Sequence, residues 1–265
     1  MEFLEEVFAL GKEKQHFIII AVLSTYLAIC IILYLFSLWR KVKIPKFPRK
    51  ILLIIAHPDD ECMFFSPTVQ AETSQGNFVY VLCMTTGNYY QAGERRKSEL
   101  IRSCHVLGIP DRNVIIIDHK TLPDNPQTDW DTDVLEKEIL AIIYKLQPNK
   151  VITFDSYGVS GHRNHRAVYQ SVHDICEKNK MPKFTRVFVL ISLSVFRKYS
   201  SIFDLPLSFL SSQRLFVSSP RKTWNAWRAM FAHRSQLAWF RILYLMFSNY
   251  MFVNSLKEIC HHGDC

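Results

Sequence analysis

The sequence has seven cysteines but no C-x-x-C pair. Their number is odd and they are scattered along the chain: Cys30, Cys62, Cys83, Cys104, Cys176, Cys260 and Cys265. A disulfide framework would need paired cysteines in a small secreted domain. We therefore expect reduced, buried or idle thiols and a reducing compartment.

Internal repeats and low-complexity segments are also missing. Hydrophobic residues make up 49% of the 265 residues and charged residues 21%. This composition excludes a disordered or fibrous chain. The length suffices for one well-packed domain with an additional anchor.

Acidic residues are too few to balance the basic ones, so the formal net charge is +8. A basic chain is typical of proteins with an acidic partner, which here means nucleic acid, an anionic membrane or a phosphorylated ligand. No base-reading motif is evident, and the basic residues after residue 187 lie among aromatic ones. We therefore expect no nucleic-acid binding.

No charged residue occurs between residues 17 and 39. A helix of 23 residues spans the roughly 30 Å core of a bilayer, and its length argues against the alternative, a cleaved signal peptide. The basic residues that follow, Arg40 to Lys50, predict a cytosolic domain after a lumenal residue 1–16 segment. Residues 40–49 would form a basic juxtamembrane linker against anionic headgroups.

Short apolar runs alternate with helix-like stretches after residue 50. The predicted strands are 50–56, 78–84, 114–118, 151–155 and 188–193, and the predicted helices are 94–107, 133–146 and 165–178. This alternation predicts an α/β domain with a mostly parallel sheet and helices on both faces. Ligands in such folds bind beyond the carboxyl ends of the strands.

The first predicted strand leads directly into the motif AHPDDE. His57, Asp59 and Asp60 can point in different directions from a strand-end loop. An imidazole and a carboxylate suit zinc or a similar cation, and a spare carboxylate can take a proton from a bound water. The alternative is an acidic turn that caps the next helix. The preceding strand and the His-Pro pair favour the metal site.

A second polar loop, SYGVSGHRNH, follows the strand at 151–155. His162 and His165 are three residues apart, which places both on one side of a first helical turn. One histidine can bind a metal while the other donates a proton or a hydrogen bond. Two surface histidines are the alternative, but a His-Asp-His set formed with the first loop is typical of a catalytic metal site.

These motifs resemble the LmbE-like metal-dependent de-N-acetylases, whose hallmarks are A-H-P-D-D-E and a downstream H-x-x-H. The resemblance covers about residues 50–256 and is closer to the eukaryotic N-acetylglucosaminyl-phosphatidylinositol de-N-acetylases (the PIG-L family). The stretches that carry it are FFSPTV, GNYYQAGERRKSELIRSCHVLGIP, TFDSYGVSGHRNH and HRSQLAWFRILYLMFSNYMFVNSL. Some bacterial relatives have a tyrosine where this chain has Ser160, so a tyrosine in the oxyanion pocket is not expected here.

The resemblance implies a Rossmann-like fold and the second step of glycosylphosphatidylinositol (GPI) anchor synthesis on the cytosolic face of the endoplasmic reticulum. The site roles it implies are His57, Asp60 and His165 as metal ligands, Asp59 as general base, His162 as general acid or oxyanion stabiliser, and Arg96 as a substrate contact. Zinc is the expected metal, with iron or manganese as alternatives. Deacetylation of another amino-sugar conjugate and an inactive membrane scaffold are the competing functions.

The C-terminal part is less regular. Residues 194–256 are expected to lie close to the membrane, and residues 237–253 to form either an interfacial helix or a core helix. Arg241 argues against a membrane span there, because a mid-span arginine costs roughly 3 kcal/mol. Residues 257–265 are expected to be a tail, so its cysteines and histidines are not predicted to bind metal.

Overall fold

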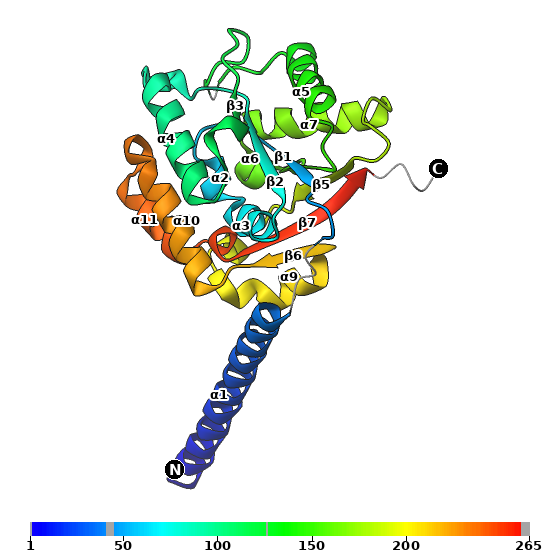
Figure 1. The fold of residues 1–265 in the computed structure, drawn as a ribbon. Helices are drawn as coiled ribbons and strands as arrows, with labels where there is room; N and C mark the ends of the chain where they lie inside the picture. Colours follow the sequence, from blue (N-terminus) through cyan, green and yellow to red (C-terminus); the bar gives the residue numbers. More distant parts are fainter. Residues whose placement is uncertain (1, 41–44, 126, 261–265) are drawn as a thin grey trace.

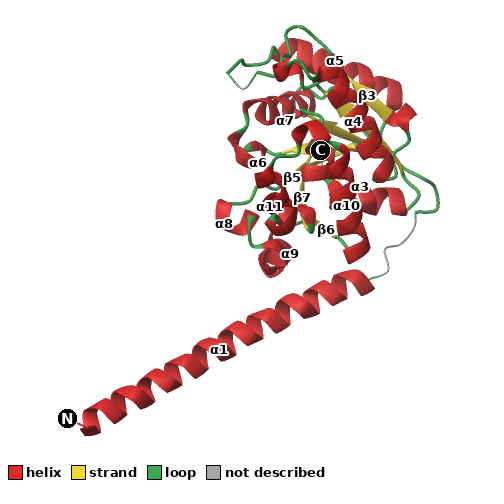
Figure 2. Cartoon of the chain, turned by 90° about the vertical axis from the view of Figure 1, so that its left-hand side faces the viewer, coloured by secondary structure: helices red, strands yellow, loops and turns green. Residues whose placement is uncertain are grey.

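The structure, a computed structural model, describes residues 2–40, 45–125 and 127–260. It consists of an α/β domain and a long helix, α1 (Glu2–Trp39), that projects away from it (Figures 1 and 2). Residues 14–39 of α1 form one helix long and apolar enough to cross a bilayer, the only such helix within these ranges. The expected N-terminal apolar helix is therefore present.

A seven-stranded sheet forms the centre of the domain, in the order β3-β2-β1-β4-β5-β7-β6. The first five strands are parallel and confirm the predicted runs, and β7 is antiparallel to both of its neighbours. The strands are β1 (Lys50–Ile55), β2 (Phe78–Cys83), β3 (Val114–Ile116), β4 (Lys150–Phe154), β5 (Arg186–Leu190), β6 (Arg214–Val217) and β7 (Val253–Cys260).

Helices cover the sheet on both sides, as expected (Figure 1). On one side α3 (Ser66–Ser74) packs against β2 and β7, with α4 (Gly93–Val106) and α10 (Pro220–Ala232) packed together nearby. On the other side α7 (Arg163–Glu177) packs against β1 and β4, with α5 (Thr132–Leu146) against it. Both α5 and α7 bury one apolar stripe, which is why sequence periodicity found them.

The strand order changes direction between β1 and β4. The chain leaves β1 towards β2 on one side, whereas β4 adds to the other edge of β1. The loops that follow these two strands therefore lead to opposite sides of the sheet. In doubly wound folds, ligands bind in the crevice between such loops. Both polar motifs lie in these two loops, immediately after Ile55 and Phe154.

Shorter helices complete the domain. They are α2 (Asp60–Met63), α6 (Gly158–Gly161), α8 (Val195–Lys198), α9 (Leu205–Ser211) and α11 (Trp239–Phe247), with 3-10 turns at Asn88–Tyr90, Asp111–Asn113, Ser201–Asp204, Arg234–Gln236 and Asn249–Met251. The segment 237–253 is thus not one helix but α11, a turn and the start of β7. Tyr244 and Leu245 of α11 are buried in the domain core, whereas Trp239, Phe240 and Leu243 are exposed, so the placement of the outer face at the membrane interface stays a prediction.

The end of the domain differs from the prediction. Residues 257–260, which were expected to belong to a tail, form the end of strand β7, because β7 pairs with β5 on one side and β6 on the other. Glu258 forms a close ion pair with Arg186 of β5, so the charged residues of this stretch belong to the sheet. Residues 261–265, with the remaining tail histidines and Cys265, lie outside the described residues, as do residues 41–44 of the predicted linker.

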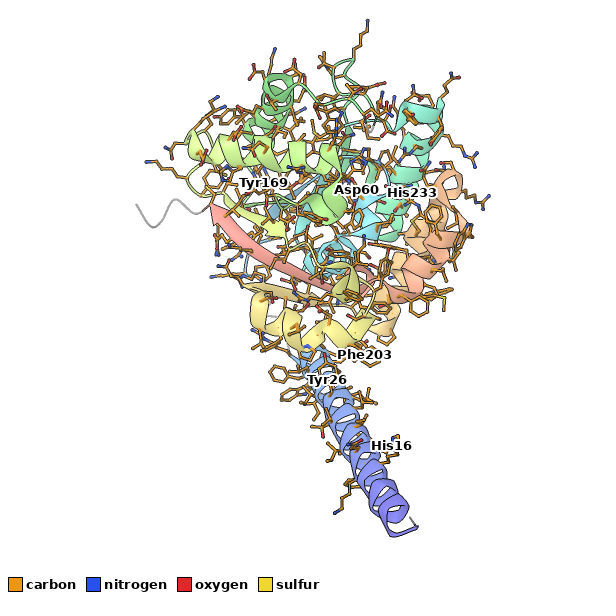
Figure 3. All side chains as sticks on the ribbon, turned by 180° about the vertical axis from the view of Figure 1, so that it is seen from behind. His16, Tyr26, Asp60, Tyr169, Phe203 and His233 are labelled. Atoms are coloured by element: carbon orange, nitrogen blue, oxygen red, sulfur yellow. The ribbon has the colours of Figure 1, made fainter. Side chains whose placement is uncertain are left out.

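Helix α1 contacts the domain along its C-terminal half. The Tyr26 hydroxyl donates to the Phe203 carbonyl at 2.6 Å, and the Tyr34 hydroxyl donates to the Ser218 carbonyl at 3.1 Å. Cys30, between them, is fully buried against the domain. Figure 3 shows Tyr26 and Phe203 side by side at this junction, far from His16.

Candidate active site

The loop after β1 places the buried carboxylate of Asp60 at the centre of the candidate site. Asp60 begins α2, and its Oδ2 accepts hydrogen bonds from the backbone N–H groups of Ala56 and His57 at 3.1 and 2.8 Å. Its Oδ1 lies 3.2 Å from His165 Nε2. Burial disfavours the ionised form, but the neighbouring His165 nevertheless holds the pKa of Asp60 well below its ordinary value. Asp60 is therefore a fixed carboxylate between the two loops.

Asp59 occupies an unusual backbone conformation. Its φ is 128° and its ψ −20°, a region that residues other than glycine rarely adopt. The backbone N–H of Asp59 donates to Glu61 Oε2 at 3.1 Å, and Glu61 in turn accepts from His233 Nε2 at 2.8 Å and from the Ser103 hydroxyl. Strain of this kind costs about 1–3 kcal/mol and persists only where its surroundings enforce it. The buried Glu61 and His233 provide that enforcement (Figure 3 labels His233 beside Asp60).

Two guanidinium groups face the Asp59 carboxylate. Arg241 Nη1 lies 2.9 Å from Asp59 Oδ2, and Arg96 Nη2 lies 3.8 Å from the same oxygen. The side chain of Asp59 is only 7% exposed, so these charges act with little screening by water. The carboxylate is thereby oriented on two sides by cations.

The second loop positions the two histidines of H-x-x-H. Gly158 has a φ of +67°, and a side-chain carbon there would approach the His165 Cβ to 2.8 Å, so glycine is required. The His162 side chain caps α7 by accepting from the Asn164 backbone N–H. His165 Nδ1 lies 3.1 Å from the Gly158 carbonyl, and a carbonyl can only accept, so this nitrogen carries the proton.

These tautomers separate the two histidines chemically. His165 uses Nδ1 for the Gly158 carbonyl and turns its buried Nε2 towards Asp60 Oδ1, 3.2 Å away. A neutral His162 that accepts through Nδ1 carries its proton on Nε2 and is a donor towards the site. Burial, together with His57 and His165, lowers the pKa of His162 to about 4. The arrangement suits His165 as a metal ligand and His162 as a hydrogen-bond donor.

His57 completes the cluster from the first loop. Its Nε2 lies 3.3 Å from Asp124 Oδ1 and 3.0 Å from Asn164 Nδ2, and its Nδ1 lies 3.7 Å from Asp60 Oδ2. Burial opposes its protonation, but Asp124 and Asp60 raise the pKa of His57 to about 9. Asp124 belongs to the loop between β3 and α5.

One ring nitrogen from each of His57, His162 and His165 lies within 4.8 Å of the others. Asp60 contacts two of these rings. Imidazole nitrogens and a carboxylate at these distances are ligands that suit zinc or a comparable divalent cation. The structure thus brings together all five residues predicted from the two motifs: His57, Asp59, Asp60, His162 and His165.

The sixth predicted residue, Arg96, also lies at the site. It is buried on α4, donates to the carbonyls of Gly87 and Pro58 at 3.0 and 2.9 Å, and pairs with Asp124 at 3.0 Å. It therefore ties two loops to the site, and its role in contacting substrate stays a prediction.

Sequence reasoning missed three contributors: Asp124, Arg241 and the Glu61–His233 pair. Asp124 sits in a loop with no periodic signal. Arg241 is a lone arginine in an apolar run, which in the sequence argues only against membrane insertion. A charged residue in such a run equally indicates a side chain that reaches a buried partner.

The chain is similar in sequence to proteins that are named as deacetylases. The family model for GlcNAc-PI de-N-acetylase (PIG-L) matches residues 52–176. The N-acetylglucosaminyl-phosphatidylinositol de-N-acetylase of Bos taurus is 42% identical over 85% of this chain and 92% of its own length. A probable enzyme of the same name from Dictyostelium discoideum is 33% identical over 80% and 93%.

Among solved structures, the N,N'-diacetylchitobiose deacetylase of Pyrococcus horikoshii superposes with a TM-score of 0.62 at 16% identity. The alignment covers 88% of this chain and 91% of that one. At this identity the match bears on the fold alone, and it confirms the predicted LmbE-like architecture.

Proposed function

The chain belongs to the PIG-L family of GlcNAc-PI de-N-acetylases, and on that premise we propose that it hydrolyses N-acetylglucosaminyl-phosphatidylinositol to glucosaminyl-phosphatidylinositol and acetate. This is the second step of GPI-anchor biosynthesis. The observation that carries the proposal is the convergence of three histidines and Asp60 beside a buried, strained Asp59. A scaffold without catalysis would gain nothing from such strain.

The donor set supports a metal-dependent hydrolase. His57, Asp60 and His165 would hold the cation, since the Asp60 carboxylate lies 3.2 Å from His165 Nε2 and 3.7 Å from His57 Nδ1. A bound divalent cation supplies a Lewis acid for the amide carbonyl and for the attacking water. We propose zinc, which suits imidazole and carboxylate ligands, and iron or manganese would fit the same set.

The remaining residues would move the protons. Asp59 takes a proton from the attacking water, while Arg241 and Arg96 hold its carboxylate in place. The N–H of His162 donates to the oxyanion of the tetrahedral intermediate. The departing amine then receives the proton that Asp59 took from the water, because an amide nitrogen cannot leave as an anion and the neutral His162 donates only a hydrogen bond.

Acetate release from N-acetylglucosaminyl-phosphatidylinositol by the purified protein in detergent tests this proposal. We expect release to disappear with a chelator and to return when zinc is added back, because the proposed reaction depends on the bound cation. A soluble amino-sugar conjugate serves as the comparison substrate. A folded protein that releases no acetate under any metal would contradict the proposal, and equal rates on both substrates would contradict the lipid specificity.

The N-terminal helix supports a single-pass placement in the endoplasmic reticulum membrane. Its apolar part, residues 14–39, is 26 residues long, which exceeds the ~20 needed to span a bilayer. Arg40, Lys46, Arg49 and Lys50 follow without an acidic residue between 40 and 50. The excess of basic residues favours a cytosolic catalytic domain and a lumenal N-terminus.

The surface around α1 supports close membrane contact. Tyr26 lies near the middle of the spanning stretch and contacts Phe203, so the neighbouring α9 would lie within the cytosolic leaflet. Large apolar side chains of α9 and α11 are exposed, including Leu210 at 83% and Trp239 at 77%. Exposed apolar surface of this extent is typical of a membrane or protein contact. We propose that α9 and the outer face of α11 rest in the lipid.

Protease treatment of intact microsomes tests the orientation. We expect a C-terminal epitope tag to be digested and an N-terminal tag to be protected, because the positive flank stays in the cytosol. Detergent should expose both tags, which controls for vesicle integrity. A protected C-terminal tag would contradict the cytosolic placement.

A further inference from the structure

A cavity of about 480 Å³ opens between the second site loop and α8. Ser160, two residues before His162, lines it from the loop. Ser192, Ser194 and Lys198 line it from the segment after β5. The cavity therefore adjoins the proposed active site but shares none of its metal-binding side chains.

Lys198 is the single cation among the residues that line this cavity. Its ammonium lies 5.7 Å from the ring centroids of Tyr199 and Tyr244. No carboxylate of a described residue lies within ion-pair distance of it, and burial lowers the pKa of Lys198. Aromatic rings stabilise a cation only in part, so the ammonium lacks a counter-anion.

Asp155 also lines the cavity, but its carboxylate accepts hydrogen bonds from neighbouring residues. Asp155 Oδ2 accepts from the Ser192 backbone N–H at 2.6 Å, and its Oδ1 accepts from the Ser192 hydroxyl and the Gly158 N–H. These bonds hold Asp155 against the cavity wall and satisfy its charge locally. Asp155 therefore does not neutralise Lys198.

Apolar side chains border the same cavity on its outer side. Val195 and Phe196 of α8 are 69% and 90% exposed. The contact of Lys198 with Tyr244 joins α8 to α11, whose outer face is also apolar. A ligand that fits this site has an anionic, hydroxyl-bearing head for Lys198 and the serines, and an apolar tail for α8.

We propose that this cavity binds the inositol phosphodiester of the lipid substrate, with Lys198 as the counter-ion of the phosphate. The inference rests on the proposed function, since it identifies a subsite for the same substrate. The amino sugar would then extend past Ser160 towards His162, and the acyl chains would leave along α8. Lys198 would act in specificity, not in the chemical step.

Steady-state kinetics of Lys198→Gln on the full chain in neutral detergent test this subsite. We expect the KM for N-acetylglucosaminyl-phosphatidylinositol to rise about tenfold with kcat within about twofold, because a phosphate contact remote from the amide contributes to binding alone. Lys198→Arg should restore most of the affinity. Lys183→Gln removes the same charge from an exposed position before β5 and should leave both constants unchanged.

A binding measurement separates this inference from the deacetylase function. Isothermal titration with glycerophosphoinositol, which has no acyl chains and no acetyl group, should give a Kd about tenfold weaker for Lys198→Gln than for the unmodified chain. The same loss without any acetate release by the unmodified chain would contradict the function but retain the subsite. An unchanged KM and Kd would overturn the subsite. A loss confined to binding of anionic vesicles would also overturn it and assign Lys198 to bulk phospholipid.

Discussion

Replacement of Asp59 by asparagine is expected to lower kcat by about a hundred-fold or more while the protein keeps its metal. The amide cannot accept the proton of the attacking water, but it has nearly the same shape. The contacts of Asp59 with Arg241 and Arg96 are to one carboxylate oxygen, so the loop conformation should change little. Acetate release and elemental analysis of the same sample measure the two quantities.

The controls for this experiment come from the same chain. Asp111→Asn changes an exposed carboxylate and should leave turnover unchanged. His162→Ala should give a loss similar to that of Asp59→Asn, again with the metal retained, because His162 is proposed to donate to the oxyanion and not to bind the cation. Normal turnover in either site variant would remove that residue from its proposed role.

Replacement of Asp60 is expected to abolish activity by a different route, through loss of the metal. Asp60→Ala removes a proposed ligand and also leaves the N–H groups of Ala56 and His57 without their acceptor. Each unsatisfied buried group costs about 1–3 kcal/mol, so this variant should also be less stable. Elemental analysis, together with thermal unfolding, measures both effects.

A second variant separates metal loss from unfolding. Asp60→Asn keeps an oxygen that can accept from the two N–H groups but removes the negative charge beside His165. We expect it to unfold near the temperature of the unmodified chain and still to bind metal weakly, with activity partly restored by excess zinc. Excess zinc should do nothing for Asp59→Asn. Full metal content in a folded Asp60→Asn would exclude Asp60 as a ligand.

The parallel part of the fold and both site loops were predictable because their signals are local. Buried parallel strands appear as short apolar runs, and the polar motifs follow two of them directly. Because β1 and β4 are neighbours in the sheet, both motifs lie beyond the carboxyl ends of adjacent central strands. Five site residues could therefore be predicted from the sequence.

The remaining features depend on contacts that are distant along the chain. Strand β7 is recognisable only through its pairing with β5 and β6. Its charged residues Lys257 and Glu258 are typical of a solvent-exposed tail, so the sequence alone does not indicate a strand there. Asp124 and Arg241 reach the site from a loop and from a short helix whose orientation no periodicity reveals. The strained φ of Asp59 likewise follows from its buried neighbours and not from its residue type.

The backbone strain at Asp59 lowers the free energy of unfolding at the position where the proposed general base is needed. Glycine would adopt a φ of 128° without penalty, but it has no carboxylate to accept a proton. A domain is stable by only about 5–15 kcal/mol, so a cost of about 1–3 kcal/mol at one residue is a substantial share. Glycine at residue 59 would remove this strain, but it would also leave Arg241 and Arg96 without the carboxylate that they face. A strained aspartate at this position is therefore what the proposed proton transfer would require.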